Sequence, residues 1–133
     1  MDYSVVWFKR DLRLHDHAAL TAASAHGEVI CLYVIEPGLW RQPDMSSQHY
    51  GFLCESLADL AQSLARRGVP LLVKVGEAID VLRALHDSLS FVNLYSHEET
   101  GNGWTYARDR AVATWCRDAG VDWQEHRQHG VIR

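Results

Sequence analysis

Short apolar stretches recur along this sequence, and segments with helical spacing separate them. The stretches are rich in β-branched and aromatic residues and end at glycine, proline or charged residues, which is typical of strands, and the runs at residues 5–8 and 29–35 are expected to be buried on both faces. We predict strands at residues 3–8, 29–35, 71–75, 91–95 and 121–125. We predict helices at residues 18–25, from 46 or 47 to about 67, around Ile79, Leu82 and Leu85, and at 104–119, with an irregular segment at 39–47. In the longest helix Leu53, Leu57, Leu60 and Leu64 fall on one face.

This alternation predicts a fold class. Strands that alternate with helices form a parallel sheet with helices on both faces, because right-handed crossovers must pack somewhere. We therefore expect all 133 residues to form one three-layer α/β/α Rossmann-like domain, with five parallel strands in the order 3-2-1-4-5. In such sheets ligands bind outside the carboxyl ends of the strands, where the winding reverses. The polar loops 9–15 and 96–103 should therefore converge on one cleft beside strands one and four.

The loop after the first strand is unusually rich in charge. Within eight residues it holds Lys9, Arg10, Asp11, Arg13, His15 and Asp16. It contains no glycine, and the loops that cradle phosphates in dinucleotide and P-loop sites need glycine for close backbone approach. A standard nucleotide site of either kind is therefore not expected here. Asp16 is placed to cap the following helix.

These side chains have two interpretations. Lys9 and Arg10 lie nearest the strand end and suit a phosphate or carboxylate of a ligand. Asp11 and Arg13 are better explained as an internal ion pair, with Asp109 as a second partner, because an unpaired buried arginine is costly. Elsewhere, Glu36, His97, Glu98 and Glu99 either contact the same ligand or belong to solvated loops and a helix N-terminus.

Composition excludes several other classes of protein. The chain has 13 basic and 17 acidic residues, a formal charge of −4, so it carries no sequence-wide basic footprint for nucleic acid. It contains no apolar run near the roughly 20 residues of a membrane span and no signal segment, so we expect a cytoplasmic location. No serine lies in a GxSxG elbow. We expect no catalytic residue within these 133 residues.

Cysteine and histidine spacing argues against a metal site. Cys31, Cys54 and Cys116 are far apart and sit among apolar neighbours, so we expect buried, reduced thiols. The His15-Asp16-His17 and His126 to His129 groups lack further ligands at convincing spacing. No metal is therefore expected.

The stretch Trp7-Phe8-Lys9-Arg10-Asp11-Leu12-Arg13-Leu14-His15-Asp16 resembles the opening signature of the DNA photolyase and cryptochrome family. The family continues with asparagine and often proline, where this chain has His17 and Ala18. Phe52-Leu53, Ser56-Leu57, Asp59-Leu60 and Ala107-Arg108-Asp109 resemble later family segments, so the likeness covers nearly the whole chain. It implies the N-terminal α/β domain of the family. The large helical domain that binds FAD and damaged DNA is absent from these residues, so the chain resembles an N-terminal fragment.

The resemblance implies a function for the full-length protein. Photolyases use light-excited reduced FAD to repair pyrimidine dimers, which they take out of the duplex by base flipping. The N-terminal domain would hold a second, light-harvesting chromophore. A folate is less expected, because Thr105 and Tyr106 replace a glutamate of folate-binding members, and Pro43 and Asp44 stand where those members carry a histidine. A flavin, a deazaflavin or no antenna chromophore remains open.

The resemblance also implies roles for particular residues and partners. The residues expected at the chromophore are Phe8, Lys9, Arg10, Glu36, His97, Glu98 and Trp104, and those expected in structural ion pairs are Asp11, Arg13, Arg108 and Asp109. The expected partners are the chain's own C-terminal FAD-binding domain and, through it, damaged DNA, but no membrane. Two alternatives remain open: a cryptochrome-type photoreceptor without repair activity, and a stand-alone nucleotide-binding or interaction module.

Overall fold

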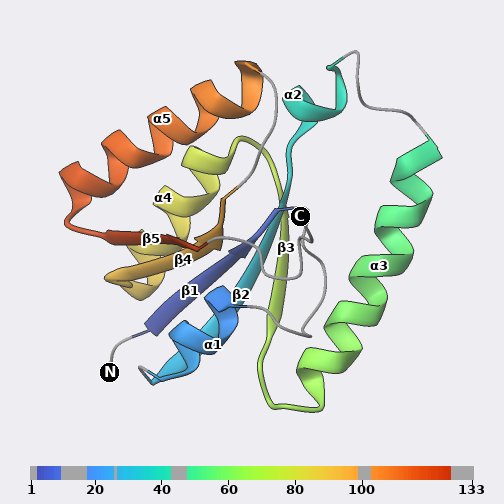
Figure 1. The fold of residues 1–133 in the computed structure, drawn as a ribbon, viewed down its shortest axis with the longest axis horizontal. Helices are drawn as coiled ribbons and strands as arrows, with labels where there is room; N and C mark the ends of the chain where they lie inside the picture. Colours follow the sequence, from blue (N-terminus) through green and yellow to red (C-terminus); the bar gives the residue numbers. More distant parts are fainter. Residues whose placement is uncertain (1–2, 10–17, 26, 43–47, 99–102, 127–133) are drawn as a thin grey trace, which may run out of the picture.

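One parallel sheet organises the chain (Figure 1). The computed structural model describes residues 3–9, 18–25, 27–42, 48–98 and 103–126. The strands are β1 (Tyr3–Phe8), β2 (Glu28–Ile35), β3 (Leu71–Val75), β4 (Asn93–His97) and β5 (Asp122–His126). The helices are α1 (Ala18–Ser24), α2 (Pro37–Trp40), α3 (Gln48–Ala65), α4 (Ala78–Leu89) and α5 (Gly103–Ala119). The strand order is β3-β2-β1-β4-β5 and every neighbouring pair is parallel, which confirms the predicted fold class.

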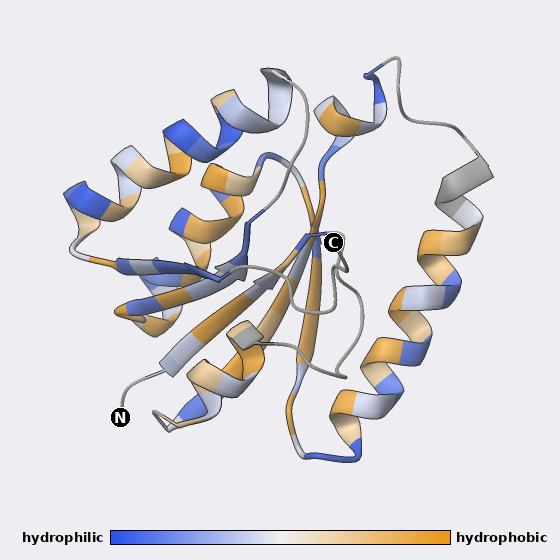
Figure 2. Cartoon of the chain, in the orientation of Figure 1, coloured by the Kyte–Doolittle hydropathy of each residue, from blue (hydrophilic) through white to orange (hydrophobic). Residues whose placement is uncertain are grey.

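The side chains of β1 point alternately to the two faces of the sheet, where they join two separate layers of the core. Val6 and Phe8 pack with α1 and with the buried leucines of α3 on one face of the sheet. Val5 and Trp7 pack with α4 and α5 on the other face. Successive side chains of a strand point to opposite faces, so a strand buried on both sides is apolar at every position. The central strands are accordingly among the most hydrophobic segments, while α3 mixes both kinds of residue (Figure 2).

The helix boundaries follow local signals. The long helix α3 buries Leu53, Leu57, Leu60 and Leu64, which confirms the predicted apolar face. Gly68, just beyond its end, has a φ of +74°, the left-handed conformation that glycine adopts most easily. None of the helices in the described residues is long and apolar enough to cross a membrane.

Two predicted elements differ most from the structure. The fourth strand begins at Asn93 instead of residue 91 and extends to His97, because pairing with β1 and β5 starts only at Asn93. Phe91 is fully buried as a core side chain ahead of the strand, so its apolar character marks burial and not strand pairing. The chain at residues 39–40 is helical and not irregular, because Pro37 starts the short helix α2. The predicted irregular residues 43–47 lie outside the described part of the chain.

The cysteine prediction is wrong at one position. Cys31 and Cys116 are buried, and burial raises the pKa of their thiols to about 12 and about 11. Cys54 is exposed, because it follows Leu53 by one residue, which turns it about 100° away from the buried face of α3.

Candidate functional site

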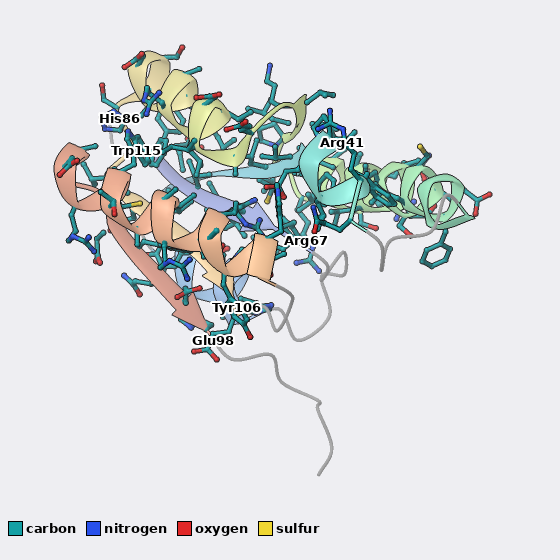
Figure 3. All side chains as sticks on the ribbon, turned by 90° about the horizontal axis from the view of Figure 1, so that it is seen from above. Arg41, Arg67, His86, Glu98, Tyr106 and Trp115 are labelled. Carbon is teal, nitrogen blue, oxygen red and sulfur yellow. The ribbon has the colours of Figure 1, made fainter. Side chains whose placement is uncertain are left out.

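Most of the buried polar residues lie where the strands end. The strand order reverses between β1 and β4, so the chain leaves these neighbouring strands toward opposite halves of the sheet. Lys9 follows β1, Glu36 follows β2 and Glu98 follows β4. The first turns of α5 lie at the same end, as the positions of Glu98 and Tyr106 show, while His86 and Trp115 lie at the other end of α5 (Figure 3).

Five charged side chains form an ion-pair network under the start of α5. Lys9, Glu36 and Arg108 are its buried centre, and Asp109 and Glu125 are more exposed. Arg108 Nη1 lies 3.1 Å from Glu36 Oε1, and Arg108 Nε lies 3.0 Å from Asp109 Oδ1. Lys9 Nζ lies 3.5 Å from Asp109 Oδ1 and 3.9 Å from Glu125 Oε2. The side chains of Lys9, Glu36 and Arg108 are 3%, 5% and 6% exposed, so these charges have lost most of their water. The network ties α5 to β1, β2 and β5.

Tryptophan rings enclose the two cations of this network. Lys9 Nζ is 4.5 Å from the centre of the Trp7 ring and 5.4 Å from that of Trp123. The guanidinium carbon of Arg108 is 5.0 Å from the Trp7 ring and 5.7 Å from the Trp104 ring. Indole faces attract cations, and the attraction strengthens when water is excluded. The cations are therefore held by carboxylates and aromatic faces together.

Glu125, the outermost carboxylate of the network, has a perturbed pKa. The pKa of Glu125 is raised, chiefly by burial, while Lys9 lowers it and the charges of Asp109 and Glu98 raise it. Lys9 Nζ, 3.9 Å from Glu125 Oε2, is shared with Asp109, so its attraction does not offset the cost of partial burial.

A close contact joins α2 to the first turn of α5. A Cβ atom on Gly38 would lie 2.8 Å from Trp104 Cζ2, so only glycine lets the indole approach this closely. Trp104 remains partly exposed and presents an aromatic surface at the carboxyl edge of the sheet. The Glu36–Arg108 ion pair lies beside this contact, so two separate contacts join α2 to α5.

A second group of polar side chains lies on the opposite face of the sheet, beneath α1. His97 Nε2 accepts a hydrogen bond from Ala19 N at 3.3 Å, and His97 is buried. In the strand register His97 is opposite His126, whose ring stacks on Tyr95 with centroids 6.2 Å apart. Burial, and secondarily the charge of Asp122, raises the pKa of Tyr95.

The structure separates the predicted chromophore residues into three groups. Lys9 and Glu36 lie in the ion-pair network together with Arg108 and Asp109. Phe8 and His97 lie on the α1 face, and Phe8 is fully buried in the core. Glu98 and Trp104 are the predicted residues with exposed surface at this edge. The other predicted residues, Arg10, Asp11, Arg13 and Glu99, lie outside the described part of the chain.

Sequence reasoning missed three members of the site. Trp7, Trp123 and Glu125 complete the surroundings of Lys9. Trp123 and Glu125 are two residues apart on one strand and so share a face, which is a signal the sequence did contain. The candidate metal residues His15, Asp16, His17 and His129 lie outside the described part. Among the residues that the structure describes, no group of three or more potential ligands could hold a metal ion.

Comparison with known proteins identifies the family. Residues 4–133 match the family model for DNA photolyase. A deoxyribodipyrimidine photo-lyase from Salmonella typhimurium is 42% identical over 74 residues, which cover 54% of this chain and 16% of that protein. Cryptochrome-2 of Gallus gallus is 33% identical over 123 residues, which cover 90% of this chain and 20% of that protein.

A solved structure of a photolyase supports the same family. The archaeal photolyase from Sulfolobus tokodaii, described with two FAD molecules and a novel light-harvesting cofactor, matches with a TM-score of 0.83 and 27% identity. The match covers 94% of this chain and 29% of that one. The chain thus spans less than a third of the proteins it resembles. It belongs to the DNA photolyase and cryptochrome family, and corresponds to the N-terminal α/β domain of that family.

Proposed function

We propose that this chain is the light-harvesting N-terminal domain of a photolyase-type flavoprotein. The full-length protein would use blue light and FAD, bound outside these residues, to repair pyrimidine dimers in DNA. Membership of the DNA photolyase family is the observation that carries this proposal. The Salmonella relative supports the repair reaction, and the light-harvesting cofactor described for the archaeal photolyase supports the role of the domain.

The second chromophore would be a flavin or deazaflavin held at the carboxyl edge of the sheet. Trp104 offers a partly exposed indole on which a planar ring system could stack, and Glu98 offers an exposed carboxylate that could accept hydrogen bonds from a ring or side chain. Lys9 Nζ lies near two carboxylates and two indole rings, so we assign it to the scaffold instead of a ligand anion. When bound, the chromophore would absorb light and pass excitation energy to FAD.

The residues of the chain would position this pigment and do no bond chemistry. The ion-pair network fixes α5, which carries Trp104 in its first turn. The Gly38 contact fixes the indole against α2. Sites built on rigid elements hold a ligand in one orientation, and excitation transfer depends on orientation.

The repair reaction is tested on the full-length protein that carries this domain. The purified protein should show FAD absorption, and blue light should remove dimers from a UV-irradiated thymine oligonucleotide. A protein that holds FAD but removes no dimers would overturn the repair proposal. That outcome would favour a cryptochrome-type photoreceptor, which the match to the chicken cryptochrome-2 over 90% of the chain already makes the second candidate.

The antenna site is tested with matched variants of the same protein. Trp104→Ala should lower the occupancy of the second chromophore, seen as loss of its absorption band, without changing FAD content. Val92→Ala is the control, because Val92 is an apolar residue, 43% exposed, directly before β4 and so at the amino edge of the sheet. Equal occupancy in both variants would refute the assignment of Trp104. A protein that shows no second band in any variant would refute the antenna role.

A further inference from the structure

Strand β3 lies at one end of the sheet and pairs on one side only. The strand order places β2 beside it, and no other strand of the described residues pairs with it. An edge strand presents a row of N–H and C=O groups to which a further strand can be added. At the other end of the sheet, β5 carries the polar residues Asp122, Gln124 and Glu125, whereas β3 reads Leu-Leu-Val-Lys-Val.

The hydrogen bonds to β2 show which backbone groups of β3 point outward. Pro70 O accepts a hydrogen bond from β2 at 3.1 Å, and Gly76 N donates one to β2 at 3.0 Å. In a parallel pair the residues that bond to one neighbour alternate along the strand, so the even-numbered residues of β3 face β2. Leu71, Val73 and Val75 therefore direct both their N–H and their C=O groups away from the sheet.

The side chains of the same three residues form an apolar stripe on the face that α3 covers. Leu71 packs against the core cluster of that face, but Val73 is 42% exposed and Val75 is 68% exposed. Helix α3 lies closest to β3 at its own end and diverges from it toward its start, so it leaves Val75 uncovered (Figure 1). Lys74 points to the opposite face, because side chains alternate along a strand. The charge that usually protects an edge strand is thus missing from the stripe.

The pattern of β3 is complementary to itself. In an antiparallel pair centred on Val73, the two copies of Val73 are opposite each other, and Leu71 of one copy is opposite Val75 of the other. All outward N–H and C=O groups then meet a partner, and a shift by one residue would break this match. The two stripes form one apolar ladder. On the other face, each Lys74 is opposite Leu72, which its apolar stem can cover.

Charges at the two ends of β3 favour the same arrangement. Arg66 and Arg67 precede the strand and are exposed, while Glu77 and Asp80 follow it and are exposed. Asp80 also contacts Arg83 at 3.5 Å. An antiparallel pair brings the start of each strand to the end of the other, so the arginines of one copy approach the carboxylates of the second copy. Such complementarity at the rim of an interface speeds association and fixes its register.

We propose that β3 is a self-association surface, on which a second copy of this chain docks in antiparallel register to form a two-fold symmetric dimer. The sheet then continues from one copy into the other, and the same residues serve both sides of the interface. An interface one strand wide falls below the usual size for stable complexes, so we expect a weak dimer with a Kd on the order of 10–100 µM. Self-association through β3 requires neither a pigment nor the repair reaction.

Sedimentation velocity of the 133-residue chain tests the dimer. The average mass should rise from monomer toward dimer between about 5 and about 500 µM. Val73→Lys places two like charges opposite each other at the centre of the pair, so it should weaken the dimer by about tenfold or more. Val92→Lys is the matched control, because Val92 is 43% exposed and lies directly before β4, away from β3. Both positions are partly exposed, and circular dichroism checks that both variants fold.

Amide hydrogen exchange tests the outward backbone groups. At low concentration the Val73 amide should exchange rapidly, and at a concentration where the dimer predominates its protection should rise on the order of tenfold. The Lys74 amide faces β2, so its protection should not depend on concentration. Equal behaviour of the two amides would contradict the assigned register.

A single cysteine tests the register independently. Hydrogen-bonded antiparallel pairs have Cα atoms about 5.5 Å apart, within reach of a disulfide. Val73→Cys, made together with Cys54→Ala, should therefore oxidise to a covalent dimer. Val75→Cys in the same background should not, because the two copies of Val75 would be four residues apart along the strands, roughly 14 Å.

Exchanging charges tests the electrostatic match. Arg67→Glu and Glu77→Arg should each weaken the dimer several-fold, whereas both changes in one chain should restore it, because opposite charges face each other again. The proposal is overturned if the wild type stays monomeric up to about 500 µM. It is also overturned if Val73→Lys and Val92→Lys associate equally, or if association continues beyond the dimer, which a closed two-fold pair does not allow.

Discussion

Removing the charge of Arg108 tests the ion-pair network directly. Arg108 contacts Glu36 at 3.1 Å and Asp109 at 3.0 Å, and the side chains of Arg108 and Glu36 are 6% and 5% exposed. Arg108→Met keeps most of the length and apolar volume of the side chain but removes the guanidinium. The Glu36 carboxylate then stays buried without its arginine.

The expected cost follows from this burial. Breaking a buried ion pair by removing one partner destabilises a protein by about 3–5 kcal/mol, because the remaining charge is uncompensated. The Arg83–Asp80 pair provides the comparison, since it has an N to O distance of 3.5 Å but side chains that are 55% and 64% exposed. Arg83→Met should cost no more than about 1 kcal/mol.

The assay is urea unfolding of the two variants and the wild type at pH 7. Adding Glu36→Gln to Arg108→Met should recover part of the loss, because the buried charge is then gone. Protonation of Glu36 has the same effect, so the deficit of Arg108→Met should shrink as the pH falls from 7 toward 5. If Arg108→Met costs no more than Arg83→Met, or if Glu36→Gln adds a further full loss, the network does not contribute as argued.

Three further predictions concern single positions. Gly38→Ala should cost about 1–3 kcal/mol in urea unfolding, because the new Cβ would lie 2.8 Å from Trp104, whereas Gly51→Ala, with open space around it, should stabilise α3 by about 0.5–1 kcal/mol. Glu125→Gln should raise the free energy of unfolding more at pH 7 than at pH 4, because the pKa of Glu125 is raised in the folded state and its ionisation therefore opposes folding. An equal effect of the substitution at both pH values would contradict this. Cys54 should react with iodoacetamide in the native protein, as read by mass spectrometry, while modification of the two buried cysteines before unfolding would be contrary to the structure.

Sequence patterns were sufficient to predict the fold because its determinants are local. The central strands β1 and β2 carry their own apolar runs, and the helices between the strands impose parallel pairing and a limited set of strand orders. The error at β4 shows where local patterns fail. Phe91 is apolar because it packs in the core, whereas Ser96 and His97 belong to the strand because β1 and β5 pair around them. Pairing between strands is a tertiary property that hydropathy does not encode.

The site was less accessible to sequence reasoning, because its contacts span the chain. Lys9 and Asp109 are 100 positions apart and Glu36 and Arg108 are 72 apart, so no spacing rule joins them. A lysine at the end of a parallel strand suggested a ligand anion, yet Lys9 meets Asp109 and Glu125 of its own chain. The chemistry that attracts a bound anion also attracts an internal carboxylate, and only the three-dimensional arrangement tells the two apart.

Contacts on both faces of the sheet thus hold the helices that begin at its carboxyl edge. On one face the ion-pair network holds α5, and on the other His97 holds α1. The two anchors lie on opposite faces of the sheet and share no residue, so loss of one should release one of the two helices while the other stays in place. A pigment at this edge would then lose one wall of its site before the domain unfolds, so loss of pigment should precede loss of helical circular dichroism in a urea titration.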